Sequence, residues 1–477
     1  MTDLPAAADA PPDWVRDAVF YEIFPDRFFN GDPGNDPTAL ADWQRDAPTR
    51  HNFFGGDLAG ITQKLPYLEG LGINALYLTP IFAAGTNHRY DTHDYRLVDP
   101  MLGDAGVLRE LVQEAHGRGI RVVLDAVFNH VGDGFWAFRD LKTRGAQSRY
   151  RDWFVTQSLP IRSDPPNYQT CGGASYLPKL NTHNAEVREH LLGVATYWIE
   201  QADIDGWRLD VPWKVPLDFW STFLTRVKAV KPDAYVLGEA WWTWGDQLGV
   251  VDGLMNYRLR RRLLDFCLYQ HADGEDLAVE TDQLLRAGDG KQMLNLLGSH
   301  DTPRLLTLAT GDESRVRLAL AALFTFPGTP MIYYGDEIGL EGGDDPDCRR
   351  PMQWQEKSWN SGLHEFVRQL VRLRRERVSL RRGDWSCVCA FNRVLAFRRR
   401  CDDEETLVIL NGGETYRDLA LELTDAAAVA YEDALGNGVA HVLDGRLTIP
   451  TLPSRAAMIL RAQSDGREPA ATAAGSR

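Results

Sequence analysis

The sequence lacks the features that mark membrane, secreted and nucleic-acid-binding proteins. Among its 477 residues, no apolar run is long enough to span a bilayer. The first residues, 1–14, are Pro/Ala-rich and acidic, without the basic start and apolar stretch of a signal peptide. Lys and Arg are outnumbered, so the formal net charge is −15, whereas nucleic-acid binding needs clustered cations. We therefore expect a cytoplasmic protein that binds neither membranes nor nucleic acid.

Paired cysteines are lacking too. The six cysteines are scattered along the chain, and none forms the Cys-x-x-Cys arrangement of a zinc site. Free thiols in a reducing compartment are the simplest interpretation. What remains is ordinary for a globular protein, since 44% of the residues are hydrophobic and 25% are charged. The length allows a large core and a second module.

Strand and helix patterns alternate from residue 18 to residue 334. In one unit, Asp104 can cap a helix, and Gly117 and Gly119 can end it. The apolar positions of this helix follow the spacing i, i+3, i+4, i+7; they are Leu108, Leu111, Val112 and Ala115. An almost continuous apolar run over residues 120–128 comes next, as in a strand buried on both faces.

This pattern recurs often enough to predict a closed barrel. The eight candidate strands are residues 18–24, 74–79, 120–128, 204–211, 234–239, 253–257, 293–297 and 330–334. Repeated βα units of this number favour a (β/α)8 TIM barrel, an α/β fold. The alternative is a doubly wound open sheet, which would want a glycine-rich phosphate loop after an early strand, and the sequence contains none.

Two regions depart from the βα pattern. The connection over residues 128–186 is rich in Gly, Pro, Asn and aromatic residues, and a loop of this length is usually functional, so we expect an inserted subdomain there. After residue 383, short strand patterns alternate with turn signals such as Asn411-Gly412-Gly413, which predicts an antiparallel β-sandwich. The expected parts are therefore a tail (1–14), the barrel (15–382), the sandwich (383–463) and a disordered tail (464–477).

One carboxylate, Asp210, ends the fourth predicted strand in the segment Gly206-Trp207-Arg208-Leu209-Asp210. Side chains alternate along a strand, so Arg208 and Asp210 point the same way, into the barrel near its rim. A buried ion pair is an equally good interpretation of these two residues alone. An arginine beside a carboxylate also keeps that carboxylate ionised, which a nucleophile requires.

Two more carboxylates follow later strands. Glu239 ends the fifth strand, and the nearby Trp241 and Trp242 would raise its pKa, which suits a general acid. Asp301 follows the seventh strand beside His300, and this pair could hydrogen-bond a polyol. Each has a plainer alternative. Glu239 could be an exposed loop residue, and Asp301 could cap a helix that begins at Thr302-Pro303.

The combination of the three carboxylates is more informative than any one of them. They fall at the carboxyl ends of strands four, five and seven, the face on which barrel enzymes carry out chemistry. Glycoside hydrolysis passes through a positively charged, oxocarbenium-like state. It needs one ionised carboxylate to attack and one protonated acid to assist the leaving oxygen, and a third can bind sugar hydroxyls as charge develops. The sequence therefore indicates a glycoside hydrolase.

The motifs around these residues resemble those of the α-amylase family of glycoside hydrolases, and more narrowly its neopullulanase, cyclomaltodextrinase and maltogenic amylase branch. The matching segments stand in the family's order and spacing at residues 125–130, 177–180, 206–210, 238–239 and 299–301. The resemblance runs from about residue 19 to residue 460. It implies a retaining hydrolase in which Asp210 is the nucleophile, Glu239 the acid/base and Asp301 the transition-state stabiliser.

The resemblance also implies contacts with the substrate. Arg208 would orient Asp210, while His130 and His300 would contact the sugar in the cleaved subsite. Tyr90 would stack on that sugar.

Further along the substrate, Asp345 and Arg349 would hold the non-reducing end, and Trp241 would be a platform for the leaving group. The sequence departs from the branch just after the nucleophile, where residues 211–214 read Val-Pro-Trp-Lys in place of the usual Val-Ala-Asn-Glu. Trp213 at this position implies an altered leaving-group subsite.

A structural calcium site is implied as well. Residues 30–36 place four oxygen-bearing side chains within seven positions, and Gly55-Gly56-Asp57 follows. Hard oxygen ligands suit calcium, although a turn with capping roles explains the spacing alone better. Members of the branch bind calcium at the corresponding positions. The implied ligands are the side chains of Asn30, Asp32, Asn35, Asp36 and Asp57 and the carbonyl of Gly55.

The branch usually carries an extra N-terminal β-module that builds a dimer. The first predicted strand here begins near residue 18, so we expect that module to be absent and leave a homodimer open. The expected substrate is an oligosaccharide: the α-1,4 links of short or cyclic maltooligosaccharides, or a small cyclic sugar with mixed links such as cyclic maltosyl-maltose.

Two other functions are compatible with the family. An apolar leaving-group side rich in tryptophan, with Trp213, Trp241 and Trp242, would favour an α-glucanotransferase that uses the same covalent intermediate. A catalytically silent sugar-binding protein would have lost a carboxylate or the arginine, whereas all three carboxylates and Arg208 are present.

Overall fold

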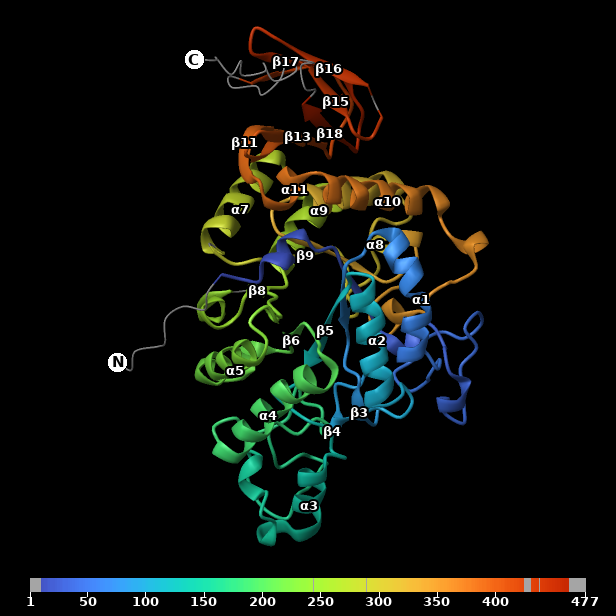
Figure 1. Cartoon of the computed structure of the whole chain (residues 1–477), viewed down its shortest axis with the longest axis vertical. Coiled ribbons are helices and arrows are strands. Elements are labelled where there is room, and N and C mark those ends of the chain that lie inside the picture. Colours follow the sequence, from blue (N-terminus) through green and yellow to red (C-terminus); the bar gives the residue numbers. More distant parts are fainter. Residues whose placement is uncertain (1–9, 243, 289, 424–429, 437, 463–477) are drawn as a thin grey trace, which may run out of the picture. The chain divides into compact units, whose positions relative to one another are not determined.

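The computed structural model describes residues 10–242, 244–288, 290–423, 430–436 and 438–462. The chain divides into two compact units, shown in Figure 1. The barrel unit comprises Met1–Arg261, Leu284–Gly311 and Gly328–Val371, and the C-terminal unit comprises Arg262–Gln283, Asp312–Pro327 and Arg372–Arg477. The tail predicted to be disordered, 464–477, lies outside the described residues, as does most of the predicted N-terminal tail.

Eight parallel strands form the barrel, which confirms the predicted fold. They are β1 (Phe20–Ile23), β2 (Ala75–Leu78), β5 (Arg121–Ala126), β6 (Gly206–Leu209), β7 (Tyr235–Gly238), β8 (Gly253–Leu254), β9 (Leu294–Leu296) and β10 (Thr329–Tyr333). Their order is β8-β7-β6-β5-β2-β1-β10-β9. A parallel bridge between Met255 and Leu294 joins the two ends, so the sheet closes on itself.

The strands are buried because their side chains are almost all apolar or aromatic. Residues from six of them form one core cluster inside the barrel, among them Phe20, Tyr77, Val123, Leu237 and Leu296. Helices that follow the strands lie around the outside (Figure 1): α1 (Leu58–Leu71), α2 (Ala105–Gly117), α4 (Ala185–Ala202) and α5 (Leu217–Val230). This arrangement places the carboxyl ends of all the strands at one rim.

Helix α2 shows how closely local sequence determines an element. The Asp104 side chain accepts hydrogen bonds from the backbone N–H groups of Gly106 and Val107, as the predicted cap requires. The four predicted apolar positions are buried. The helix ends at Gly117, and Gly119 adopts a left-handed conformation with φ of 70°.

Two insertions extend the rim of the barrel. Strands β3 (Phe82–Ala84) and β4 (Thr92–Val98) form a small antiparallel sheet that the sequence pattern did not predict. Its register is irregular, which obscures the alternation of side chains. The long connection over residues 128–186 contains α3 (Trp136–Arg144), short 3-10 turns and isolated bridges such as His130–Lys179.

The region predicted to be an antiparallel β-sandwich lies in the C-terminal unit, where its strands form one eight-stranded sheet. Its strands are β11 (Asp384–Phe391), β12 (Val394–Cys401), β13 (Glu404–Asn411), β14 (Tyr416–Glu422), β15 (Ala430–Asp433), β16 (Val439–Leu443), β17 (Arg446–Leu452) and β18 (Ala456–Ala462). One face of the sheet buries a cluster that includes Ile409, Tyr431 and Leu460.

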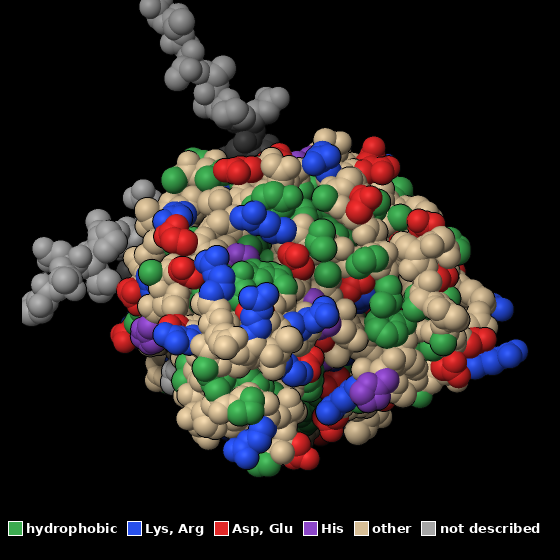
Figure 2. Space-filling view, turned by 90° about the horizontal axis from the view of Figure 1, so that it is seen from below, with side chains coloured by type: hydrophobic (Ala, Val, Ile, Leu, Met, Phe, Trp, Pro, Cys, Tyr) green, Lys and Arg blue, Asp and Glu red, His purple; other side chains and the backbone are tan. Residues whose placement is uncertain are grey.

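The remaining helices are α6 (Tyr257–Leu264), α7 (Gly274–Ala287), α8 (Leu305–Leu308), α9 (Glu313–Thr325), α10 (Ser361–Glu376) and α11 (Val378–Arg382). Among the described residues, no helix combines the length and the apolar character needed to cross a membrane. On the face drawn in Figure 2, basic and acidic side chains are interspersed.

At the opposite end of the barrel from the predicted site, Asp205 precedes β6 and anchors a charge cluster. Its carboxylate lies 2.7 Å from His116 Nε2, 2.7 Å from Arg121 Nη1 and 2.9 Å from Lys231 Nζ. Burial alone would raise the pKa of Asp205, but these partners lower it to about 2. The cluster therefore favours the ionised carboxylate in the folded protein.

We expect Asp205→Asn to lower the free energy of unfolding by about 2 kcal/mol at pH 7. The folded pKa lies below the unfolded value of about 3.9. The stabilisation is thus present above pH 4 and is lost as the pH falls towards 2. Urea unfolding at several pH values measures this. The exposed Asp203, which also contacts Lys231, is the control, and Asp203→Asn should have little effect. An effect of Asp205→Asn that does not change with pH would contradict the assignment.

Candidate active site

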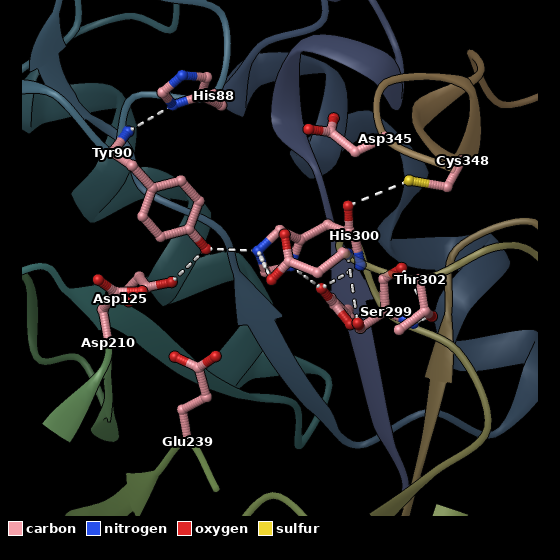
Figure 3. A network of polar contacts seen from close by, with 12 residues as sticks. His88, Tyr90, Asp125, Asp210, Glu239, Ser299, His300, Thr302, Asp345 and Cys348 are labelled. Atoms are coloured by element: carbon pink, nitrogen blue, oxygen red, sulfur yellow. Dashed lines mark hydrogen bonds and ion pairs between the residues drawn. The ribbon is translucent and has the colours of Figure 1, made fainter. Parts of the chain in front are cut away.

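Three carboxylates lie at the rim formed by the carboxyl ends of the strands. Asp210 follows β6, Glu239 follows β7 and Asp301 lies five residues after the end of β9. Asp210 and Glu239 are buried, whereas the Asp301 side chain retains 34% of its exposure. Figure 3 shows Asp210 and Glu239 close to Asp125, with the Tyr90 hydroxyl between Asp125 and His300.

Arg208 joins the carboxylates of three neighbouring strands. Its Nη1 lies 2.9 Å from Asp125 Oδ2 and 3.0 Å from Asp210 Oδ1, and its Nη2 lies 2.8 Å from Glu239 Oε2. The predicted contact with Asp210 is therefore present. The contacts with Asp125 on β5 and with Glu239 were not predicted, because they join residues that are distant in sequence.

The surroundings of Asp210 act on its pKa in opposite directions. Burial raises the pKa of Asp210, the Arg208 guanidinium opposes this, and the neighbouring carboxylates Glu239, Asp125 and Asp301 raise it further. Arg208 therefore acts in the expected direction, towards the ionised form of Asp210, while burial and the neighbouring carboxylates act against it. One cation is shared among three carboxylates, so the site favours holding a proton.

Polar groups bind both oxygens of Glu239. Oε1 accepts a hydrogen bond from Trp241 Nε1 at 2.5 Å, and Oε2 accepts one from the backbone N–H of Val211 at 2.9 Å. Trp241 therefore contacts Glu239 through its polar N–H group, in addition to the apolar ring surface that the sequence led us to expect. The alternative of an exposed loop residue is wrong, because Glu239 is buried.

Asp301 contacts two basic side chains. Its Oδ2 lies 3.1 Å from His300 Nε2, and its Oδ1 lies 3.1 Å from Arg349 Nη2. Burial alone would raise the pKa of Asp301, but His300 and Arg349 lower it well below its usual value. The helix-cap alternative is wrong, because α8 begins at Leu305 and is preceded by Arg304 as its cap residue.

Three of the predicted sugar-contacting residues, Tyr90, His300 and Arg349, lie beside Asp301. The Tyr90 hydroxyl donates to Asp125 Oδ2 at 2.9 Å and lies 2.7 Å from His300 Nε2, and the two rings stack with centroids 5.5 Å apart (Figure 3). Arg349 Nη1 contacts Asp345 Oδ1 at 3.0 Å, so the pair predicted to hold the non-reducing end is adjacent to Asp301. Burial lowers the pKa of His130 to about 4, which keeps that ring neutral.

The tryptophans predicted on the leaving-group side fall into two environments. Trp241 is packed face to face on Tyr257, with ring centroids 4.0 Å apart, so Tyr257 covers one of its faces. Trp213 and Trp242 are 37% and 73% exposed, and their centroids lie 6.3 Å apart. Trp213 also lines a pocket of about 410 Å³ together with Lys179, Lys214 and residues of the 128–186 insertion.

The six predicted calcium ligands come together near the start of α1. The Asp57 carboxylate caps α1 and accepts hydrogen bonds from the backbone of Asp32 and the Asn35 side chain. The plainer interpretation, a turn with capping roles, therefore describes part of this segment. Among the described residues, no group of three or more His, Cys, Asp or Glu side chains is arranged to hold a metal ion.

Two buried amide oxygens in this segment, Asn30 Oδ1 and Asn35 Oδ1, have no hydrogen-bond partner. Asp36 Oδ1 lies beside Gly55, whose φ is 78°. A Cβ at Gly55 would come within 2.5 Å of that oxygen. Unsatisfied buried oxygens beside carboxylates are the donors that a hard cation requires, so these residues fit calcium.

Sequence reasoning missed two residues of the site as functional candidates. Asp125 begins the matching segment 125–130 but has no predicted role, and it contacts both Arg208 and Tyr90. Glu22 on β1 lies 2.5 Å from His300 Nδ1. The sequence did contain a signal for both residues, because each is the one carboxylate in a largely apolar or aromatic strand. Ionised groups are rarely buried without a partner, so each of them could have been expected to contact another functional side chain.

Comparison with known proteins gives consistent matches. A model of the α-amylase catalytic domain matches residues 22–370. Neopullulanase 2 of Thermoactinomyces vulgaris is 45% identical over 456 residues, which cover 93% of this chain and 77% of that protein. A cyclomaltodextrinase of Bacillus sp is 46% identical over 426 residues, which cover 86% and 76%.

A solved structure is similar along its whole length. It is the cyclic α-maltosyl-(1→6)-maltose hydrolase of Arthrobacter globiformis in complex with cyclic α-maltosyl-(1→6)-maltose. The match has a TM-score of 0.87 at 42% identity and covers 95% of this chain and 100% of that chain.

Proposed function

Because the chain belongs to the α-amylase family of glycoside hydrolases, we propose that it hydrolyses the α-1,4-glucosidic bonds of short or cyclic maltooligosaccharides with net retention. The observation that carries this is the Arg208 side chain, which joins Asp210 and Glu239 at the ends of neighbouring strands. This arrangement brings the two carboxyl groups that we propose as nucleophile and acid to one rim, with Asp301 nearby. Retention requires such a pair.

In the proposed mechanism, Asp210 attacks the anomeric carbon while Glu239 gives its proton to the departing glycosidic oxygen. The bond to the leaving sugar breaks as the bond to Asp210 forms. Glu239, now ionised, takes a proton from water, whose oxygen displaces Asp210 and restores both carboxyl groups. Positive charge on the sugar in each transition state favours the ionised form of Asp210, although burial raises its pKa in the free site.

Asp301 and the side chains around it would act on the sugar hydroxyls. Its carboxylate is held ionised by His300 and Arg349, so it can accept hydrogen bonds that strengthen as the ring becomes positive. The Tyr90 ring would stack on the sugar. Arg349 and Asp345 would bind its non-reducing neighbour.

A narrower proposal is a small cyclic substrate with mixed α-1,4 and α-1,6 links. It is supported by the similarity to the Arthrobacter enzyme, which this chain matches along the whole of that structure. A second candidate activity is glucosyl transfer, favoured by the exposed Trp213 and Trp242. Their apolar faces could hold an acceptor sugar in place of water.

A substrate panel tests these proposals together. Cyclodextrins, pullulan, starch, maltooligosaccharides and cyclic maltosyl-maltose would be compared by kcat/KM, with product sizes measured. Hydrolysis gives only products smaller than the substrate. Products longer than the substrate, increasing at high substrate concentration, would establish transfer. Release of no sugar from any of the substrates would contradict the proposal.

A structural calcium ion is also proposed, held by Asn30, Asp32, Asn35, Asp36, Asp57 and the Gly55 carbonyl. Its support is the pair of unpartnered buried oxygens on Asn30 and Asn35. When bound, the ion would supply charge that offsets the three neighbouring carboxylates. These residues would tie the loop that follows β1 to the start of α1, away from the reacting groups.

We expect millimolar calcium to raise the melting temperature by about 5 °C, and a chelator to reverse the change. Asn35→Ala should remove this response and leave kcat unchanged, because no step of the reaction involves the ion. Asp42→Asn, in an exposed turn of the same loop, is the control and should keep the response. A wild-type protein whose melting temperature ignores both calcium and chelator would contradict the site.

The cellular setting and assembly remain proposals as well. A cytoplasmic location is supported by one relative, the intracellular maltogenic amylase of Bacillus subtilis, at 42% identity. The six cysteines are free in the structure, as expected in a reducing compartment. A homodimer stays a prediction, which light scattering on the purified protein tests.

A further inference from the structure

A fully buried carboxylate lies behind His300, and the mechanism above gives it no role. Glu22 is the only ionisable side chain among the four residues of β1 apart from a tyrosine, and it has no exposed surface. Its Oε1 lies 2.5 Å from His300 Nδ1 and accepts a hydrogen bond from the His300 backbone N–H at 3.2 Å. Burying a carboxylate is costly unless it is paired, so the contact with His300 is what makes its burial tolerable.

Hydrogen-bond accounting shows where the protons of His300 must lie. The Tyr90 hydroxyl has one proton, which it donates to Asp125, so it must accept a hydrogen bond from His300 Nε2 at 2.7 Å. His300 Nε2 therefore carries a proton. Nδ1 faces Glu22 at 2.5 Å, a separation that requires a second proton between them.

The surroundings favour placing this second proton on the ring. Nε2 also lies 3.1 Å from Asp301 Oδ2, so His300 is flanked by a carboxylate on each side. Arg349 binds the His300 backbone carbonyl at 2.8 Å, which fixes the main chain of the residue. An imidazolium supplies one proton to each side: Nδ1 donates to Glu22 Oε1, and the single Nε2 proton is shared between the Tyr90 hydroxyl and Asp301 Oδ2. The second oxygen of Glu22, Oε2, is buried without a hydrogen-bond partner.

We propose that Glu22 is a positioning residue that holds His300 as an imidazolium, with its Nε2 proton directed at Tyr90 and Asp301. Glu22 itself would not touch the sugar. It would act through His300, which keeps Asp301 ionised and oriented towards the hydroxyls of the bound ring. The effect on catalysis rests on the proposed function, whereas the protonation of His300 does not.

The charges that face His300 agree with this assignment. Burial alone would lower the pKa of His300, but Asp301 and Glu22 raise it to about 10. Tyr90 and Asp301 face the ring beside Glu22, while His88 and Arg349 are the nearby groups that could carry positive charge. Burial lowers the pKa of His88 to about 3, so the His88 ring is neutral and adds no positive charge next to His300.

The consequence is a predictable change in titration when Glu22 loses its charge. Glu22→Gln keeps the shape of the side chain and a hydrogen-bond acceptor. Asp301 would then be the one neighbouring carboxylate that raises the pKa of His300 against the lowering effect of burial. The pKa of His300 should therefore fall towards neutrality. Above that pKa the ring loses its charge, and Asp301 loses its closest cationic partner.

The matched control is Glu337→Gln. Glu337 is likewise fully buried, beside β1 rather than on it, and accepts hydrogen bonds from Tyr21 and Tyr67 at 2.8 and 2.7 Å. It therefore tests the removal of a buried carboxylate from the same unit without touching His300.

The experiment combines histidine NMR with kinetics. Protein labelled with carbon-13 at histidine Cε1 is titrated from pH 5 to pH 9, and the His300 signal is identified by its loss in His300→Asn. We expect His300 to stay protonated throughout in the wild type and in Glu337→Gln, and to titrate within this range in Glu22→Gln. The kcat/KM for cyclodextrin should fall at least about tenfold in Glu22→Gln, mainly through kcat and increasingly at high pH. In Glu337→Gln it should change less than about twofold.

Several results would overturn the proposal. A wild-type His300 that titrates between pH 5 and pH 9 would do so even if Glu22→Gln failed to fold. So would a His300 that stays protonated in Glu22→Gln, or an equal loss of activity in Glu337→Gln. A wild type inactive on every α-glucan would contradict the proposed function instead, and the titration would still report on Glu22.

Discussion

Replacing Asp210 by Asn should lower kcat on cyclodextrin by about 10⁴- to 10⁶-fold, because it removes the group that bonds to the sugar. An amide is nearly the same size as a carboxyl group but is a far weaker nucleophile. The substitution should leave the fold intact, since Arg208 keeps its contacts with Asp125 and Glu239. Binding of substrate should change much less than kcat.

The matched control for Asp210→Asn is Asp205→Asn at the other end of the same strand. Asp205 anchors a charge cluster and should affect stability without affecting kcat at a temperature where the variant is folded. Steady-state kinetics and thermal unfolding on both variants separate the two roles. Asp210→Asn with more than a hundredth of wild-type kcat would contradict its role as nucleophile.

Glu239→Gln should lower kcat on natural substrates by about 10³-fold, because the leaving sugar then departs without a proton. The loss should depend on the leaving group. With a glucosyl fluoride, whose fluoride ion leaves without protonation, the first step should proceed nearly as fast as in the wild type. The second step should stall, because no base activates water, so a burst of fluoride release is expected.

Azide provides the decisive comparison for Glu239→Gln. As an anion it attacks the covalent intermediate without a base, so it should restore turnover on the fluoride substrate and give an α-glucosyl azide. It should not rescue Asp210→Asn. An equal loss on both substrates, without rescue by azide, would show that Glu239 acts in some other way.

The sequence was sufficient to predict elements whose signal is local. All eight barrel strands were predicted from apolar runs, and α2 was predicted from its cap and its apolar spacing. Strand β8 has only two residues against five predicted, because the run over 253–257 also supplies the bridge at Met255 and the start of α6. The β3–β4 sheet was missed because its register shifts hide the alternation.

The sequence was more informative about which residues belong to the site than about the contacts between them. Alternation along one strand predicted that Arg208 would reach Asp210, and it does. The contact of Arg208 with Glu239 joins two strands, so no pattern within either strand contains it. The pKa of Asp210 shows a related limit. Alternation predicted the effect of Arg208, which lowers this pKa, but burial and the carboxylates Glu239, Asp125 and Asp301, which raise it, act only once the chain has folded.

Glu22 and Asp301 were also difficult to interpret from the sequence, because their partners come from distant parts of the chain. Thr302-Pro303 made a helix cap plausible for Asp301, but its partners His300 and Arg349 are brought to it by the turn after β9 and by residue 349 far along the chain. Glu22 is 278 residues from His300 in sequence. Only the closing of the barrel, which pairs β1 with β10 and β10 with β9, brings them together.

The proposed mechanism requires a sugar to become covalently attached to Asp210 during the reaction. An activated, fluorinated α-glucosyl fluoride forms such an intermediate quickly and the intermediate hydrolyses slowly, so the labelled protein can be digested and its peptides analysed by mass spectrometry. We expect one added sugar, on the Asp210 carboxylate. A label on Glu239 or Asp301, or turnover of the reagent with no labelled peptide, would contradict it.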